Sequence, residues 1–154
     1  MALAWGLAGI FLAVALAGMG SIFGVSLAGQ TAAGVMTEEP KLFGKFLILV
    51  ALPGTQGIYG FAIGFMFVLK LAANLDMDTA HGLYIFFSCL PIAFAGLFSG
   101  LWQGKVCASG INLTVKQPNE SGKALIMAAF VEFYAILGFI ISFMAWLNFD
   151  QLVK

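Results

Sequence analysis

The stretch Ala128–Phe143, AAFVEFYAILGFIISF, decides the fold, because it is long and apolar yet contains one charged residue, Glu132. A carboxylate inside an apolar transmembrane helix costs roughly 2.5–3.5 kcal/mol on insertion scales. A chain that keeps Glu132 there needs a partner charge, a permanent proton or a bound cation. Polar residues elsewhere in the chain favour the cation.

The composition of the whole chain indicates an integral membrane protein. Of its 154 residues, 62% are hydrophobic and only 9% are charged, and the mean hydropathy is +1.03. Soluble domains carry about 25% charged residues, so a soluble protein of this length could not cover its surface with these side chains. Seven lysines balance seven acidic residues and there is no arginine. Without a basic patch, nucleic acid is not an expected partner.

The remaining titratable residues predict no metal cluster or disulfide. Cys89 and Cys107 lie in apolar stretches and are expected to be small buried residues. The single histidine, His81, is expected at a membrane interface near the start of a helix. Residues 1–37 carry no charged side chain and lack the basic region of a signal peptide, so we interpret them as a mature transmembrane helix.

Charged residues divide the chain into four stretches, each able to supply the 20 or so helical residues that cross a bilayer. The predicted helices are Leu3–Val35, Lys45–Leu71, Thr79–Leu113 and Ala124–Asn148, joined by loops at 37–41, 74–78 and 116–123. The predicted fold class is an all-α membrane protein with four transmembrane helices in two tandem hairpins. The first hairpin is residues 1–73, and the second, residues 74–154, contains Glu132.

The lysines predict how the chain lies in the membrane. Four of them flank the first and third loops, whereas Lys70 and Lys154 lie at the opposite side with three aspartates. The positive-inside rule therefore puts the first and third loops in the cytoplasm and both termini outside.

The sequences of the two predicted hairpins indicate a parallel internal repeat. Segments 17–24 and 93–100 match at an offset of 76 residues. After a predicted two-residue insertion the offset becomes 78, which pairs Pro40 with Pro118. At that offset Glu132 corresponds to Gly54. Either the first hairpin lacks the charge that the second hairpin has, or Gly54 is simply a packing glycine.

Small residues recur every four positions on the first and third predicted helices. The two stripes are Gly20, Gly24, Ala28 and Ala32, and Gly96, Gly100, Gly104 and Ala108. Such stripes let helix backbones approach closely in lipid. They predict either pairing inside one chain or a crowded inner surface shared by many copies. Bulky residues of the other two helices predict an outer, lipid-facing layer: Phe61, Phe65, Phe67, Phe139, Phe143 and Trp146.

The second predicted helix carries a polar face within an apolar stretch. Its residues Leu52, Thr55, Gln56 and Tyr59 are spaced i, i+3, i+4 and i+7, which places them on one side of a helix. Pro53 lacks an N–H and disturbs the preceding turn. We therefore expect a kink at which backbone carbonyls, that of Leu52 among them, become available as ligands.

Two further residues lie at a depth similar to that of this polar face. Counted from the nearest loop lysine, Gln56, Gln103 and Glu132 are 11, 13 and 9 residues into their helices. At about 1.5 Å per residue they lie within roughly 6 Å of one level. One carboxylate with hydroxyl, amide and carbonyl oxygens would leave a monovalent cation complex neutral, whereas calcium prefers more carboxylates.

Each residue also has a simpler interpretation. Thr55 can bond to its own helix backbone, the two glutamines can join helices, and Tyr59 can be a packing aromatic. Glu132 can pair with Lys105, although that lysine can also reach the cytoplasmic surface. The agreement of depth and helix face favours the cation site.

Three stretches resemble the proteolipid rotor subunit of V-type ATPases (the K or c subunit), in its bacterial sodium-pumping branch. They are Leu52–Gly60, Leu97–Val106 and Val131–Gly138, and the resemblance extends over nearly the whole chain. It implies a sodium ion held by the Leu52 carbonyl, Thr55, Gln56, Gln103 and Glu132, with Tyr59 hydrogen-bonded to Glu132.

The resemblance also implies partners: other copies in a ring, a stator subunit of the a/I type with a basic residue, a central-stalk subunit of the d/C type and the lipid of a bacterial plasma membrane. The chain shows no phosphate loop and no nucleophile–base set, so it is expected to be a non-catalytic, ion-translocating subunit. Two alternatives stay open: the same ring carrying H⁺ on Glu132, and a four-helix pore or scaffold protein.

Overall fold

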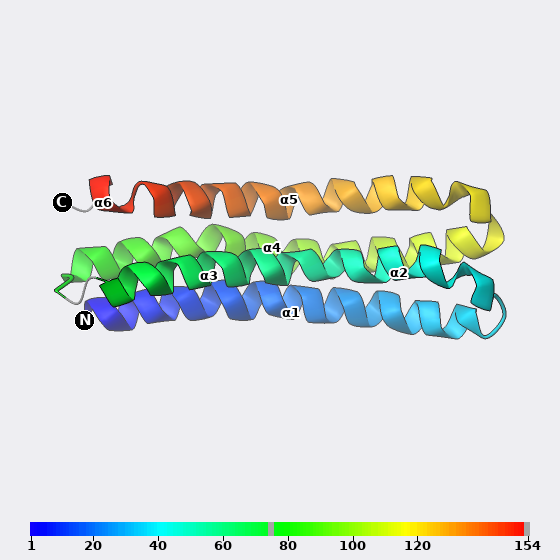
Figure 1. The fold of residues 1–154 in the computed structure, drawn as a ribbon, viewed down its shortest axis with the longest axis horizontal. Helices are drawn as coiled ribbons and strands as arrows, with labels where there is room; N and C mark the ends of the chain where they lie inside the picture. The colour runs from blue at the N-terminus through cyan, green and yellow to red at the C-terminus, as the bar shows by residue number, and fades with distance from the viewer. Residues whose placement is uncertain (74–75, 153–154) are drawn as a thin grey trace.

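A computed structural model describes residues 1–73 and 76–152 of the chain. Two residues used in the predictions lie outside the described residues: Asn74 of the predicted second loop, and Lys154, on which the predicted orientation partly depends. The long helices run side by side along one axis (Figure 1). The elements are α1 (Ala2–Met36), η1 (Pro40–Leu42), α2 (Phe43–Ala51), η2 (Leu52–Gly54), α3 (Thr55–Ala73), α4 (Thr79–Lys116), η3 (Pro118–Glu120), α5 (Ser121–Leu147) and α6 (Phe149–Leu152).

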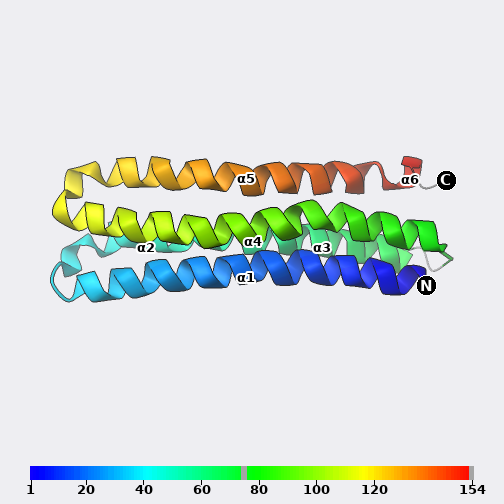
Figure 2. The same ribbon diagram turned by 180° about the vertical axis from the view of Figure 1, so that it is seen from behind.

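Within the described residues, four helical stretches are long and apolar enough to cross a membrane: Ala2–Met36, Pro40–Ala73, Thr79–Lys116 and Pro118–Leu147. They coincide with the four predicted helices, and the predicted all-α membrane fold is confirmed. The α1–α2 and α4–α5 connections lie at one end of the bundle, and the start of α1 and helix α6 lie at the other (Figures 1 and 2). Asp78 begins α4 by accepting a hydrogen bond from the His81 N–H (3.1 Å).

The second membrane stretch bends where Pro53 predicts a kink. The 3₁₀ turn η2 separates α2 from α3 there. Pro53 has no N–H to continue the α-helical ladder, so the backbone tightens into a different turn. The kink packs against α1, because a Cβ added to Gly24 would lie 2.7 Å from the Pro53 Cβ.

The two small-residue stripes face each other within one chain. A Cβ on Gly20 would overlap the Gly96 carbonyl oxygen, and a Cβ on Gly104 would overlap the Gly24 backbone. Only a hydrogen at these positions allows α1 and α4 to approach this closely. Of the two interpretations of the stripes, pairing inside one chain is therefore observed.

One bulky residue assigned to the lipid-facing layer is buried instead. Phe61 and Phe65 are 58% and 52% exposed, as that layer requires, but Phe67 is 0% exposed. Phe67 packs with Ile63 and Ile85 in a core cluster near the chain ends, and the predicted lipid-facing residues of α5 are only half-exposed, because they pack against the same cluster: Phe139, Phe143 and Trp146. The assignment of Phe67 was wrong because it lies four residues after Ile63, on the inner face of α3.

The tertiary contacts also correct the register of the repeat. A Cβ on Gly60 would overlap the Ala13 oxygen and lie 2.5 Å from the Ala17 Cβ. A Cβ on Gly138 would lie 2.8 Å from the Pro91 oxygen and 2.5 Å from the Ala95 Cβ. These two sets of contacts differ by 78 residues at every position. The offset of 76 for the first and third helices was therefore wrong, and no insertion is needed.

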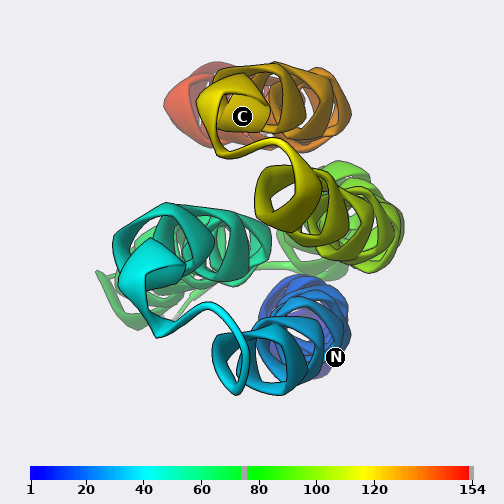
Figure 3. The same ribbon diagram turned by 90° about the vertical axis from the view of Figure 1, so that its right-hand side faces the viewer.

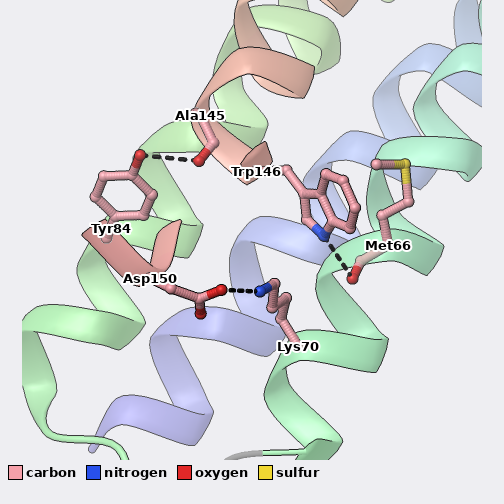
Figure 4. A network of polar contacts seen from close by, with 6 residues as sticks. All are labelled: Met66, Lys70, Tyr84, Ala145, Trp146 and Asp150. Atoms are coloured by element: carbon pink, nitrogen blue, oxygen red, sulfur yellow. Dashed lines mark hydrogen bonds and ion pairs between the residues drawn. The ribbon is translucent and has the colours of Figure 1, made fainter. Parts of the chain in front are cut away.

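A network at the end of the bundle where α1 begins ties α6 and the end of α5 to the other helices (Figure 4). Lys70 of α3 pairs with Asp150 of α6 at 2.5 Å. The Trp146 Nε1–H donates to the Met66 oxygen (3.1 Å), and the Tyr84 hydroxyl donates to the Ala145 oxygen (2.9 Å). These bonds join the end of α5 to both α3 and α4.

Candidate functional site

Glu132 lies on α5 near the middle of the membrane stretch, and it is only 8% exposed. Among the described residues, no ion pair involves its carboxylate. The predicted alternative partner, Lys105, is exposed, and its Nζ lies 3.7 Å from the centre of the Trp102 ring. The structure therefore lends no support to a structural Glu132–Lys105 pair.

Four side-chain donors surround the Glu132 carboxylate instead. The Thr55 hydroxyl (2.6 Å) and the Tyr59 hydroxyl (2.8 Å) reach Oε1. The amide nitrogens of Gln103 (2.8 Å) and Gln56 (3.2 Å) reach Oε2. A carboxylate has about four acceptor positions, so these donors fill its hydrogen-bonding capacity.

Three helices deliver these donors to one point. The turn η2 starts α3 so that Thr55, Gln56 and Tyr59 share the face directed at α5, as their spacing predicts. Gln103 extends from α4, and its Nε2 donates to both Glu132 and the Ala128 oxygen (3.1 Å). The glutamines also meet each other, through a 2.6 Å bond from Gln56 Nε2 to Gln103 Oε1. The structure thus brings together every predicted side chain of the site.

The Leu52 carbonyl lies at the edge of this cluster, but it is not free. It accepts the Thr55 N–H and lies 2.9 Å from the Thr55 hydroxyl. The missing N–H of Pro53 frees a carbonyl one helical turn earlier, not that of Leu52. Because a hydroxyl has a single hydrogen, Thr55 donates at any moment to Leu52 or to Glu132, but not to both.

One polar atom of the cluster has no partner. Gln56 Oε1 is buried and accepts no hydrogen bond from the described residues. Buried amide oxygens are normally paired, so an orphan of this kind needs an explanation, such as an ion. No group of three or more His, Cys, Asp or Glu side chains that could hold a metal occurs in the described part of the chain. The cluster is instead a set of hard oxygens with one negative charge, the donor chemistry that suits an alkali cation.

The site lies directly beneath the outer surface of α5. The neighbours of Glu132 on that helix, Phe130, Phe133 and Tyr134, are all more than half exposed. Because α5 buries Glu132 and turns its neighbours outward, a single layer of side chains separates the carboxylate from the outer surface of the helix.

Sequence reasoning missed the contacts that hold the kinked helix in place. Ser21 on α1 accepts a hydrogen bond from the Gly57 N–H at 2.8 Å, next to the site. Ser21 and Gly57 are 36 residues apart, and neither has a local signal for this bond. Their contact depends on the depth at which α1 and α3 pack together.

Known proteins share these features across most of the chain. The family model of the ATP synthase C subunit matches residues 3–67 and 86–145. The V-type sodium ATPase subunit K of Enterococcus hirae is 50% identical over 136 residues, which are 88% of this chain and 86% of that protein. The A-type ATP synthase subunit K of Methanocaldococcus jannaschii is 36% identical over 139 residues, 89% of this chain and 59% of that protein.

A more distant similarity links the chain to a eukaryotic protein. The c′ subunit of the V-type proton ATPase of Saccharomyces cerevisiae is 30% identical over 139 residues, 90% of this chain and 84% of that protein. Four apolar helices, the buried acid on the last of them and the match to the family model agree with the predicted resemblance, which is thereby confirmed. The chain belongs to the family of the ATP synthase C subunit.

Proposed function

We propose that this chain is the membrane rotor subunit of a V-type rotary ATPase, and that it carries Na⁺ across the membrane on Glu132 as a ring of copies turns. The observation that carries the proposal is a buried carboxylate without an ion pair among the described residues, held by hydroxyl and amide side chains beside an unpartnered amide oxygen, Gln56 Oε1. The 50% identity to a V-type sodium ATPase subunit K favours sodium as the ion.

The ion would bind to Glu132, Gln56, Gln103, Thr55 and the Leu52 carbonyl. The unpaired Gln56 Oε1 supplies one ligand without breaking any bond. The Thr55 hydroxyl can donate to Glu132 and turn a lone pair toward the ion, which leaves one lone pair of the Leu52 oxygen for the ion beside the Thr55 N–H. Tyr59 keeps its bond to Glu132 and holds the carboxylate in place. One carboxylate and one monovalent cation leave the site neutral.

The neutral charge of the ion-loaded site would couple ion binding to rotation of the ring. An unloaded, charged Glu132 cannot face lipid without a cost of several kcal/mol, whereas the loaded site can pass through the lipid phase. At the stator, a basic residue of an a/I-type subunit would compete for the carboxylate and release the ion. A new ion would then reload the site from the other side of the membrane before the ring moves on.

The rest of the complex follows from this role. ATP hydrolysis would occur in other subunits, and a central-stalk subunit of the d/C type would transmit the torque to the ring. The chain itself would be non-catalytic and would lie in a bacterial plasma membrane. The α1–α2 and α4–α5 connections would face the cytoplasm, with both termini outside.

Carbodiimide labelling of the purified, detergent-solubilised protein tests the sodium site. We expect a single modified residue, Glu132, and slower labelling in Na⁺ than in K⁺ at the same ionic strength and pH. Equal labelling in the two salts, with pH alone controlling the rate, would contradict sodium binding. That outcome would instead support the proton rotor, which the similarity to the c′ subunit of a proton ATPase makes the second candidate.

A further inference from the structure

A line of aromatic rings runs from the ion site toward the end of the bundle where α1 begins. The centre of the Tyr59 ring lies 5.5 Å from that of Phe139. Phe139 stacks on Phe143 at 5.9 Å, and Phe143 stacks on Trp146 at 5.8 Å. We call these four residues the aromatic column. Its first member, Tyr59, donates a hydrogen bond to Glu132 Oε1 (2.8 Å).

Helical spacing builds the column. Phe139, Phe143 and Trp146 are spaced i, i+4 and i+7, so all three lie on one face of α5. That face is directed at α3, because the Trp146 Nε1–H donates to the Met66 oxygen of α3 (3.1 Å). Viewed along the bundle, α5 lies across α3 and α4, on the side opposite α1 (Figure 3). The column therefore stands between α3 and α5.

The far end of the column is held in place by polar contacts (Figure 4). Besides its bond to the Met66 oxygen, the Trp146 ring has the Lys70 Nζ 5.9 Å from its centre, within the range of a cation–π interaction. Lys70 also pairs with Asp150 of α6 at 2.5 Å. Next to Asp150, Phe149 is buried, and the Lys70 Nζ lies 5.7 Å from the centre of its ring. The Trp146 ring thus cannot turn without breaking its contacts to α3.

The first hairpin has a similar pair of phenylalanines without the rest of the column. At the offset of 78, Phe61 and Phe65 are the counterparts of the two phenylalanines of the column, and they stack at 6.0 Å. Both are more than half exposed. Val68 occupies the position that corresponds to Trp146, and Gly54 the position that corresponds to the acid. The anchored column therefore occurs in the hairpin that has the acid.

Tyr59 is the point at which the column meets the ion site. Its ring is only half-buried, so packing restrains it on one side. The hydroxyl stays at Glu132 only while the ring keeps one rotamer, because a turn about the first side-chain bond would carry the hydroxyl away. Phe139 is the ring that lies against Tyr59 from α5, the helix that also bears Glu132.

We infer that the aromatic column positions the Tyr59 hydroxyl for ion binding. Phe139, held by Phe143 and Trp146, keeps the Tyr59 ring in the rotamer in which its hydroxyl holds the Glu132 carboxylate. The three column residues of α5 are positioning residues that act through Tyr59 and do not bind the ion. The inference rests on the proposed function, because it concerns how the ion-carrying carboxylate is held.

A double-mutant cycle tests the inference, with the sodium concentration that half-protects Glu132 from carbodiimide as the readout. Phe139→Leu should raise this concentration several-fold, because leucine leaves the Tyr59 ring free to turn. In a chain that already carries Tyr59→Phe there is no hydroxyl to position, so Phe139→Leu should cause little further change. The same shift with and without Tyr59→Phe would indicate a general loosening of the bundle and would overturn the inference.

Phe61→Leu is the matched control. Phe61 is the counterpart of Phe139 in the first hairpin, and its ring is exposed and stacked on Phe65. This change should leave the half-protecting concentration unchanged, and circular dichroism checks that both variants keep their helices. A shift as large as that of Phe139→Leu would overturn the inference.

Two changes at Trp146 test the anchor of the column. Trp146→Phe keeps a ring on Phe143 but loses the bond to the Met66 oxygen, whereas Trp146→Ala loses both. The half-protecting concentration should therefore rise more for Trp146→Ala than for Trp146→Phe. No rise in either variant would overturn the role assigned to Trp146.

The failure of this inference is distinguishable from that of the proposed function. If sodium protects Glu132 in the unmutated protein but Phe139→Leu behaves as Phe61→Leu does, only the positioning role is refuted. If sodium gives no protection in the unmutated protein, the sodium rotor is refuted. The same cycle, measured by the pH of half-maximal labelling, then still tests whether Phe139 acts through Tyr59.

Discussion

At the scale of single residues, hydrogen bonds rather than a counter-ion stabilise the buried carboxylate of Glu132. Glu132 receives two hydroxyl and two amide donors from α3 and α4, and Lys105 lies elsewhere, over Trp102. Hydrogen bonds to charged groups contribute about 1.5–3 kcal/mol each, so four of them offset much of the desolvation of one carboxylate. The same side chains can turn their oxygen atoms toward a cation when one is present.

Removal of the charge at Glu132 tests its role as the ion carrier. We expect Glu132→Gln to abolish ion transport by the complex while the copies still assemble, because glutamine keeps the size and can still bond to the amide side chains. Sodium uptake by reconstituted vesicles measures transport, and native electrophoresis measures assembly. Transport at the unmutated rate would show that the ion does not travel on this residue.

Tyr59 tests the contribution of one hydrogen bond. Tyr59→Phe removes the 2.8 Å bond to Glu132 but keeps the ring beside Phe139. Because the proposed site has this bond with and without the ion, its loss should act by letting the carboxylate move. The sodium concentration for half-protection of Glu132 should therefore rise by less than the roughly 10- to 150-fold that the full contribution of one bond to a charged group, about 1.5–3 kcal/mol, would give. Tyr84→Phe is the matched control, because its hydroxyl bonds the Ala145 oxygen at the far end. Equal shifts in both variants would mean a general loosening of the bundle.

At the scale of elements, the close pairing of α1 with α4 sets the position of everything else. The kink of the second membrane stretch packs into the space left by Gly24, and the Ser21 hydroxyl beside it holds the Gly57 N–H. α1 thereby fixes where α3 presents Thr55, Gln56 and Tyr59. A change in the separation of α1 and α4 would alter the ion site without touching any of its ligands.

Gly20 tests this pairing. Gly20→Ala adds a Cβ that would overlap the backbone of α4 at Gly96 and Leu97, which cannot move aside as a flexible side chain could. Overpacking of this kind typically costs about 1–3 kcal/mol, so the unfolding temperature in detergent should fall by several degrees.

Gly29→Ala is the control for this change, since its nearest atom is 3.8 Å away on Val50 and it lies on the same helix. It should leave the unfolding temperature unchanged within a degree or so. An equal fall in both variants would mean that helix propensity or lipid contact, not the α1–α4 approach, explains the result.

At the scale of the whole molecule, the chain forms two hairpins with matching contacts, and only the second has an acid at the depth of Glu132. Glu132 corresponds to Gly54 at the offset of 78, and a Cβ on Gly54 would make only an ordinary 3.7 Å contact with Val25. Tight packing therefore does not explain this glycine. One acid for four helices implies half as many ions per turn as a ring of the same number of hairpins that each carried an acid.

Gly18 tests the assembly of copies. Gly18→Leu adds a side chain into open space in the single chain, so the helices should stay folded, as measured by circular dichroism. At the offset of 78, Gly18 is the counterpart of Gly96, which packs against Ala17 inside the chain, so we expect Gly18 to pack against the next copy in the proposed ring. The added side chain should obstruct that packing, and native electrophoresis should show a loss of large assemblies. Gly34→Leu, also in open space on α1, should assemble normally. Normal assembly of Gly18→Leu would contradict the packing of α1 against the next copy.

The amino-acid sequence by itself determined the membrane location, the four helices, the kink at Pro53 and the meeting of Gln56, Gln103 and Glu132. These follow from hydropathy, helical periodicity and depth, which are local properties or simple counts along the chain. The loop lysines at the ends of the apolar stretches made the depths comparable.

Only the tertiary structure decided the register of the repeat, the burial of Phe67 and the partners of the Leu52 carbonyl. Small residues spaced four apart match one another at more than one offset, so sequence similarity alone could not choose between 76 and 78. The choice depends on which backbones touch, as Gly60 does with Ala13 and Ala17. Contacts between residues far apart in the chain are set by how whole helices pack, and no local pattern records them.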